Sequence, residues 1–306
     1  MKFITWNVQW FCGLDDVVDL ERVVNDANAF AGEGGFDVLC MQEVAVNYPR
    51  LPGNAGFDQP AVLRKLLPGY HVFFGPAVDE FNPEAATLGQ RQQFGNVIAT
   101  RLPVLQVQHY PLAYPADTTA GAVRSMPRMC TCVTVRDPTL GTVRIMTTHL
   151  EFYSTIQRLA QVHAVRALHA QACTQAAYPP LQDDTGWPFQ SKEHTVRAIV
   201  CGDWNFEPQS TEYQLIQSEV LLENTINHAR DNIKNKATQF LDAWRLVHGD
   251  RPHEPTFRLF DRRYGPVPIT CDFVFLTDDL KACVRSVSVE LQTRASDHQP
   301  VMVELI

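Results

Sequence analysis

Residues 196–205 read Val-Arg-Ala-Ile-Val-Cys-Gly-Asp-Trp-Asn, an apolar run that ends in a carboxylate and an amide. The run Val196–Asp203 is rich in Val and Ile, as buried strands are. Burial of the Asp203 carboxylate and the Asn205 amide in an apolar core would be unfavourable, so these residues indicate where the chain leaves the core. In layered α/β proteins, strand C-termini lie along one edge, where ligands bind. The segment therefore predicts a strand that carries polar groups to a site.

The same arrangement recurs along the chain. Polar groups also stand at the ends or starts of apolar runs in Thr5-Trp6-Asn7, Met41-Gln42-Glu43, Thr147-Thr148-His149-Leu150-Glu151, Thr270-Cys271-Asp272 and Ser296-Asp297-His298. If these segments converge, they bring together four carboxylates, two amides and two imidazoles: Glu43, Asp203, Asp272, Asp297, Asn7, Asn205, His149 and His298. Neighbouring carboxylates raise each other's pKa, and a divalent cation removes that conflict. Oxygen ligands select a hard ion, Mg²⁺ first and Mn²⁺ or Ca²⁺ next.

Short apolar runs alternate with helical patterns over the whole chain. The remaining strands are expected at Lys2–Val8, Asp37–Gln42, Val72–Phe74, Asn96–Thr100, Cys130–Arg136, Val143–His149, Cys271–Leu276 and Val301–Leu305. Helices are expected at Thr155–Ala177, Leu14–Glu33, Gln59–Leu67 and Gln239–His248, and after Ser210-Thr211-Glu212. The apolar face of the long helix is expected to include Ile156, Leu159, His163 and Ala167. The long loops do not resemble interdomain linkers, so residues 1–306 are expected to form a single domain.

Composition excludes several classes of protein. The 306 residues are 45% hydrophobic and 20% charged, which is typical of a globular chain and argues against disorder. The net charge of −8 argues against a protein that coats duplex nucleic acid. No apolar stretch approaches the ~20 residues of a membrane span, and the first residues do not predict a signal peptide. The eight cysteines form no Cys-x-x-Cys pair, which predicts reduced thiols and a cytoplasmic location.

In their order along the chain, these motifs resemble the endonuclease/exonuclease/phosphatase superfamily, the DNase I-like fold. The resemblance rests on Trp6-Asn7, Gln42-Glu43, Thr148-His149-Leu150, Gly202-Asp203-Trp204-Asn205, Asp272-Phe273 and Ser296-Asp297-His298. It implies a four-layer two-sheet α/β sandwich with outer helices, and phosphoester hydrolysis with magnesium. The group that contains tyrosyl-DNA phosphodiesterase 2 is the most similar branch, through Thr5-Trp6-Asn7, Gln42-Glu43-Val44, His149-Leu150-Glu151 and Arg158.

The resemblance also implies roles for individual residues. Glu43 would be the main metal ligand, with Asn7 and Asp297 close by. Asp203 would orient or deprotonate the attacking water, and Asn205 would hold a phosphate oxygen or fix Asp203. His298, paired with Asp272, would contact the phosphate as base or electrostatic stabiliser, while His149 would stabilise the transition state or assist the leaving oxygen. Either Asp203 or His298 could be the base. Where many relatives carry Arg two residues before the strand Asp, this chain has Thr270.

Other residues beside the motifs are candidates for indirect or substrate roles. Glu151 and Arg158 are expected either to pair in support of the site or to brace the start of the long helix. One or two loop arginines could bind substrate phosphate; the candidates are Arg91, Arg124, Arg128, Arg262 and Arg263. Aromatic residues that flank the motifs could stack on a ring or pack in the core; these are Trp10, Phe11, Phe152, Tyr153 and Trp204.

The expected activity is metal-dependent hydrolysis of a phosphodiester, in the manner of a phosphodiesterase or nuclease. One alternative is a phosphatase that acts on a small phosphate ester or a phospholipid headgroup. Another is a non-catalytic binding module on the same fold, although such a module should have lost some of Glu43, Asp203, Asn205 or His298. The expected partner is a phosphate-ester substrate, nucleic acid among the candidates, and no protein partner is predicted.

Overall fold

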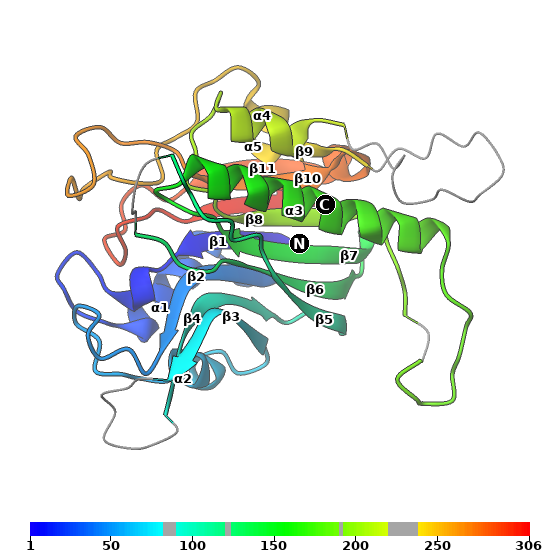
Figure 1. The fold of residues 1–306 in the computed structure, drawn as a ribbon, viewed down its shortest axis with the longest axis horizontal. Helices are drawn as coiled ribbons and strands as arrows, with labels where there is room; N and C mark the ends of the chain where they lie inside the picture. The colour runs from blue at the N-terminus through cyan, green and yellow to red at the C-terminus, as the bar shows by residue number, and fades with distance from the viewer. Residues whose placement is uncertain (82–89, 120–123, 190–191, 220–237) are drawn as a thin grey trace.

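Two six-stranded sheets pack face to face, with helices on both outer faces (Figure 1). The computed structural model of the chain describes residues 1–81, 90–119, 124–189, 192–219 and 238–306. The first sheet has the order β11 (Val284–Val289), β12 (Val301–Leu305), β1 (Lys2–Asn7), β2 (Val38–Val46), β4 (Arg91–Thr100), β3 (His71–Phe81). The second has the order β5 (Val104–Pro111), β6 (Met129–Asp137), β7 (Gly141–His149), β8 (Ala198–Asp203), β10 (Asp272–Thr277), β9 (Phe240–Asp242).

Three apolar clusters hold the four layers together. The cluster between the sheets contains Phe3 and Cys40 from one sheet and Ile145 and Cys201 from the other. Along each central strand, the residues that alternate with these point to the outer face of the sheet and are apolar as well, so the central strands are apolar on both faces. The helices cover those outer faces: α1 (Leu20–Ala31) and α2 (Gln59–Leu66) on the first sheet, α3 (Thr155–Ala177) and α4 (Thr211–Gln217) on the second, with α5 (Ala243–His248) beside β10 and β11. The predicted two-sheet α/β sandwich is confirmed.

Each sheet has one parallel pair at its centre, and these pairs position the site. β1 runs parallel to β2, with Asn7 opposite Gln42, and β7 runs parallel to β8, with His149 opposite Asp203. The buried amide of Gln42 donates to Thr5 Oγ1 at 3.2 Å and, across the sandwich, to Thr147 Oγ1 at 2.8 Å. The C-terminal ends of all four strands therefore meet at one edge of the sandwich.

The structure adds three strands that the sequence patterns did not predict: β5, β9 and β11. All three lie at the edge of a sheet. β5 and β11 are mostly half-buried, and β9 has only three residues. Edge strands have one side without a partner strand, so their apolar signal is weak.

The helices differ from the prediction in three places. The helix predicted at Gln239–His248 begins only at Ala243, because Phe240–Asp242 form β9 and the Asp242 side chain caps α5. α1 begins at Leu20 rather than Leu14, because the Asp19 side chain accepts from the Arg22 amide and caps the helix. α3 has the predicted bounds, but its buried face was wrongly predicted, since His163 is exposed whereas Gln157 is buried. Gln157 donates to Pro115 O at 2.8 Å and accepts from Ser125 Oγ at 2.6 Å, so the preceding loop satisfies a polar group that faces inward.

No helix in the described ranges has the length and apolar character that a bilayer span requires. The cysteines of the chain are unpaired, and all but Cys283 are buried.

Candidate active site

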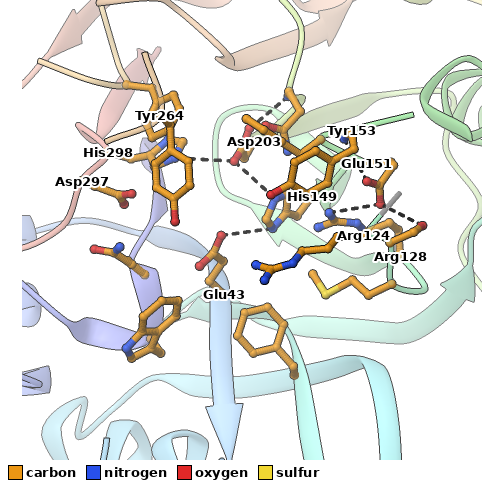
Figure 2. A pocket seen from close by; sticks show the side chains of 18 residues that line it. Glu43, Arg124, Arg128, His149, Glu151, Tyr153, Asp203, Tyr264, Asp297 and His298 are labelled. Atoms are coloured by element: carbon orange, nitrogen blue, oxygen red, sulfur yellow. Dashed lines mark hydrogen bonds and ion pairs between the residues drawn. The ribbon is translucent and has the colours of Figure 1, made fainter. Parts of the chain in front are cut away.

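Side chains from the ends of several strands converge on one carboxylate oxygen, Oδ2 of Asp203. Asp203 Oδ2, at the end of β8, accepts from Asn7 Nδ2 of β1 at 3.0 Å. It also lies 3.4 Å from His149 Nε2 of β7 and 3.7 Å from His298 Nε2, which precedes β12 (Figure 2). The structure thus brings residues from three other segments of the chain to Asp203, as the sequence patterns predicted.

Glu43 enters the same site from β2 by leaving the regular strand. The pairing of β2 with β4 shifts register between Met41 and Val44, and Glu43 lies in this irregularity with φ +63°. Its carboxylate accepts from Asn7 Nδ2 at 3.1 Å and lies 3.9 Å from His149 Nδ1. Bulges and left-handed non-glycine residues cluster at functional sites because they redirect side chains. Here the bulge turns Glu43 toward the pocket (Figure 2).

Asn7 and Asn205 orient the carboxylates. Asn7 presents its Nδ2 to Glu43 and Asp203, while its Oδ1 accepts from the Gln9 amide at 3.1 Å. In this orientation Asn7 braces the two carboxylates, and its oxygen would face an ion only after rotation of the amide group. The backbone N–H of Asn205 donates to Asp203 Oδ1 at 3.0 Å, and its side chain donates to Leu150 O at 2.8 Å.

Contacts with three other residues fix the position of His298. Its Nδ1 lies 2.9 Å from Asp272 Oδ2, and its ring stacks on Phe257 with centroids 4.3 Å apart and planes at 19°. Trp6 Nε1 donates to the His298 carbonyl at 2.9 Å. Asp272 Oδ1 is buried and has no hydrogen-bond partner among the described residues, and Thr270, two residues earlier, donates instead to Glu254 O.

The buried carboxylates resist ionisation. Burial raises the pKa of Asp203 to about 6, with a further contribution from the Asp272 charge. Burial likewise raises the pKa of Asp297 to about 6, with help from Glu43, and it raises the pKa of Glu43 itself. Three carboxylates that are costly to ionise therefore share one small space.

The two histidines have opposite preferences. Burial lowers the pKa of His149 well below its ordinary value, and the nearby cations Arg128 and His298 lower it further. Burial would also lower the pKa of His298, but Asp272, Asp203 and Asp297 outweigh that effect and raise it to about 10. Near neutral pH the site thus holds a neutral His149 and a cationic His298.

The donor set fits a hard divalent ion. Glu43 and Asp297 offer carboxylate oxygens, and a cation would relieve the repulsion that raises their pKa values. Asp203, Cys271 and His298 also have ligand atoms within 4.8 Å of one another. That group is a poor metal site, because burial raises the pKa of the Cys271 thiol well above its usual range and His298 is cationic. The carboxylate side of the site is the better position for an ion.

Glu151 and Arg158 do not pair with each other through their side chains. Glu151 is fully buried, and its carboxylate lies 3.4 Å from Arg128 Nη2. Arg158 pairs with Glu212 at 2.9 Å and donates to the backbone carbonyls of Glu151 and Phe152. Arg158 therefore braces the start of α3, whereas Glu151 faces the pocket.

A pocket of about 380 Å³ surrounds these groups. Two of the five loop arginines considered from the sequence line the pocket, Arg124 and Arg128. Three of the five aromatic residues that flank the motifs also line it, Trp10, Phe152 and Tyr153, whereas Phe11 and Trp204 are buried in the core. The other lining residues are Gln9, Glu43, Phe94, Ser125, Met126, His149, Glu151, Asp203, Asn205, Phe257, Tyr264, Asp297 and His298. The sequence patterns missed Phe94, Phe257 and Tyr264, since none adjoins a polar strand end.

Comparison with known proteins agrees with this architecture. Residues 4–298 match the model of the Endonuclease/Exonuclease/phosphatase family. An endonuclease/exonuclease/phosphatase from Beutenbergia cavernae is 25% identical, with a TM-score of 0.63 and coverage of 100% of this chain and 71% of that one. The mannosyl-6-phosphatase Bt3783 of Bacteroides thetaiotaomicron is 15% identical, with a TM-score of 0.60 and coverage of 100% and 99%. Truncated Caenorhabditis elegans TDP2 is 17% identical, with a TM-score of 0.58 and coverage of 100% and 96%. No curated protein sequence matches the chain.

Proposed function

This chain belongs to the Endonuclease/Exonuclease/phosphatase family, and we propose that it hydrolyses a phosphodiester by attack of water on phosphorus, with a divalent metal ion as cofactor. The observation that carries the proposal is the convergence on Asp203 Oδ2 of Asn7, His149 and His298, from three other segments of the chain. A carboxylate held among an amide and two imidazoles is suited to water activation beside a phosphate.

The proposed metal site consists of Glu43 and Asp297, with Asn7 beside them, and Mg²⁺ is the ion that this oxygen donor set favours. When bound, the ion neutralises charge on the phosphate oxygens. Glu43 is pre-oriented for this role by its bulge and by the amide of Asn7. Asp297 is buried beside the His298 ring that faces the phosphate in the proposed mechanism.

The remaining catalytic roles are assigned to side chains of the protein. His298 is held as a cation between Asp272 and Asp203, so it serves as an electrostatic stabiliser of the phosphate rather than as the base. Asp203 then orients the water and accepts its proton, while the Asn205 backbone fixes the other Asp203 oxygen. Neutral His149 faces both Asp203 and Glu43, where it can stabilise charge on the reacting phosphate.

Hydrolysis of bis(p-nitrophenyl) phosphate with Mg²⁺ tests the proposal. Asp203→Asn should lower kcat by about 10²–10⁴-fold, because it removes the proton acceptor and preserves the shape. Asp250→Asn is the matched control, since Asp250 is exposed outside the pocket. A chelator should abolish turnover, and added Mg²⁺ should restore it. Full turnover by the Asp203→Asn variant would refute the role of Asp203, and metal binding without hydrolysis of any phosphoester would indicate a binding module.

A phosphatase acting on a small phosphate ester is the second candidate, because a 380 Å³ pocket is at the small end of the range for ligand sites. Parallel assays with p-nitrophenyl phosphate separate the two activities. A polynucleotide substrate should also show activity that falls steeply with salt, whereas a small ester should show little salt dependence.

A further inference from the structure

A second, much smaller cavity adjoins Asp272, the residue that holds His298 in place. It has a volume of about 10 Å³ and shares no lining residue with the larger pocket. Its polar lining includes Asp272, His253 and Thr256. A cavity of this volume has room for about one water molecule. The roles proposed above for hydrolysis use neither His253 nor Thr256.

His253 is a buried imidazole whose two nitrogen atoms have different surroundings. Its side chain is 4% exposed, and its ring stacks on Trp244 with centroids 5.6 Å apart and planes at 24°. Nε2 lies 2.6 Å from Asp242 Oδ2, which also accepts from the Tyr213 hydroxyl at 2.6 Å. Because a carboxylate is an acceptor, Nε2 donates in this contact, and Nδ1 is left as an acceptor. Nδ1 is buried and has no hydrogen-bond partner in the described ranges.

Two other polar groups that line the cavity are incompletely hydrogen-bonded. Asp272 Oδ2 contacts His298 Nδ1 at 2.9 Å, but Oδ1 is buried and has no partner among the described residues. Thr256 Oγ1 accepts from the backbone N–H groups of Cys271 and Asp272 at 3.1 and 3.2 Å. No described residue accepts the hydrogen of this hydroxyl, although Thr256 is fully buried. Leaving buried polar groups without partners is costly.

We propose that one buried water joins these three groups, and that His253 is a positioning residue for the proposed hydrolysis, on which this role rests. The water donates one hydrogen to His253 Nδ1 and the other to Asp272 Oδ1, and its oxygen accepts the hydrogen of Thr256 Oγ1. Three hydrogen bonds are typical of a buried water. A single molecule therefore satisfies all three groups.

The water completes a chain of hydrogen bonds that ends at His298. The chain runs from Tyr213 through Asp242 and His253 to the water. From the water it continues through Asp272 to His298. A carboxylate held at Oδ1 as well as at Oδ2 cannot rotate away from the imidazole, so the His298 ring keeps its direction. Small displacements of a group that acts on the substrate reduce the rate strongly.

Amide substitutions at His253 separate the contributions of its two nitrogens, because a glutamine amide reaches the place of Nε2 and an asparagine amide reaches that of Nδ1. His253→Gln should keep the contact with Asp242 and lose the contact with the water. With bis(p-nitrophenyl) phosphate and Mg²⁺, it should lower kcat by about 10-fold and leave KM within about 2-fold of wild type. His253→Asn should keep the contact with the water and recover kcat to within about 3-fold of wild type.

His248→Gln is the matched control. His248 packs on the same Trp244 ring, with centroids 4.1 Å apart, but does not line the cavity. This variant should leave kcat unchanged. Full kcat in His253→Gln would overturn the role of His253. A kcat in His253→Asn as low as that in His253→Gln would also overturn it, because packing alone would then explain both losses.

Two measurements on the metal-free protein do not depend on hydrolysis. A crystal structure should show a water within about 3.2 Å of both His253 Nδ1 and Asp272 Oδ1. The ring ¹⁵N NMR signals of His298 should shift in His253→Gln and stay in place in His248→Gln. A cavity without this water, or unmoved His298 signals in His253→Gln, would overturn the proposal. If both signatures are present and the wild type hydrolyses no phosphoester, the proposed function alone is refuted.

Discussion

The Nδ1 atom of His298 lies 2.9 Å from Oδ2 of Asp272, and this contact joins the loop before β12 to the first residue of β10. Because Nδ1 is engaged, Nε2 is the ring atom that faces Asp203, at 3.7 Å. The pair therefore decides both the orientation of the imidazole and its charge.

Asp272→Asn should lower kcat by about 10²–10⁴-fold with a smaller change in KM, because it removes the charge that favours protonated His298. The pKa of His298, which is raised to about 10 in the wild type, should fall in the variant. Histidine NMR titration of the metal-free protein measures this shift directly. Asp250→Asn should change neither quantity, and an unaltered His298 pKa in Asp272→Asn would contradict the pairing.

Asp297 should destabilise the metal-free protein near neutral pH. Its folded pKa is about 6, against 3.8 for an ordinary Asp. Well below pH 3.8 the carboxyl is protonated in both the folded and the unfolded form, and Asp297 costs nothing. The cost grows as the pH rises above 3.8 and reaches its full value of about 3 kcal/mol above pH 6. Asp297→Asn should therefore raise the free energy of unfolding by an amount that grows from pH 4 to pH 7, as measured by urea denaturation in chelator. Added Mg²⁺ should stabilise the wild type more than the variant.

His169 should make stability fall in acid. Burial and the Arg144 charge lower its pKa to about 3, so the folded protein keeps it neutral. Below pH 6.5 the unfolded chain takes up a proton that the folded form does not, and stability declines by up to about 1.4 kcal/mol per pH unit toward pH 3. His169→Gln should flatten this decline in urea denaturation series, whereas His163→Gln, at an exposed position, should leave it unchanged.

Gly202 should tolerate no side chain. It has φ +137°, and an added Cβ would lie 1.8 Å from the Thr148 carbonyl oxygen on the neighbouring strand. Gly202→Ala should destabilise the protein by about 3 kcal/mol or more, because backbone must move to relieve the clash. Gly69→Ala is the control for strain alone, with φ +87° and nothing within 4 Å of an added Cβ, and should cost about 1 kcal/mol. Similar losses in both variants would contradict the predicted clash.

The groups proposed for catalysis could be read from local sequence because each follows or precedes a buried strand. Glu43, His149 and Asp203 end apolar runs whose residues are buried on both faces of the sheet. A carboxylate or an imidazole is costly to bury in an apolar core, so these side chains were expected at the point where the strand emerges from it. Apolar periodicity also predicted the bounds of α3, because it records burial directly, whereas the sandwich was predicted from the resemblance of the motifs to a known family. Whether these residues act as proposed stays a prediction.

The amino-acid sequence by itself determined the alternation of strands and helices and the choice of the residues proposed for catalysis, because burial periodicity and a polar strand end are local properties of the chain. Only the tertiary structure decided which arginines enter the pocket, that Glu151 pairs with Arg128 rather than Arg158, and that Phe257 stacks on His298. Glu151 and Arg128 lie 23 residues apart along the chain, and Phe257 and His298 lie 41 residues apart. Such pairings depend on loop paths and strand register, and no local pattern of residues encodes them.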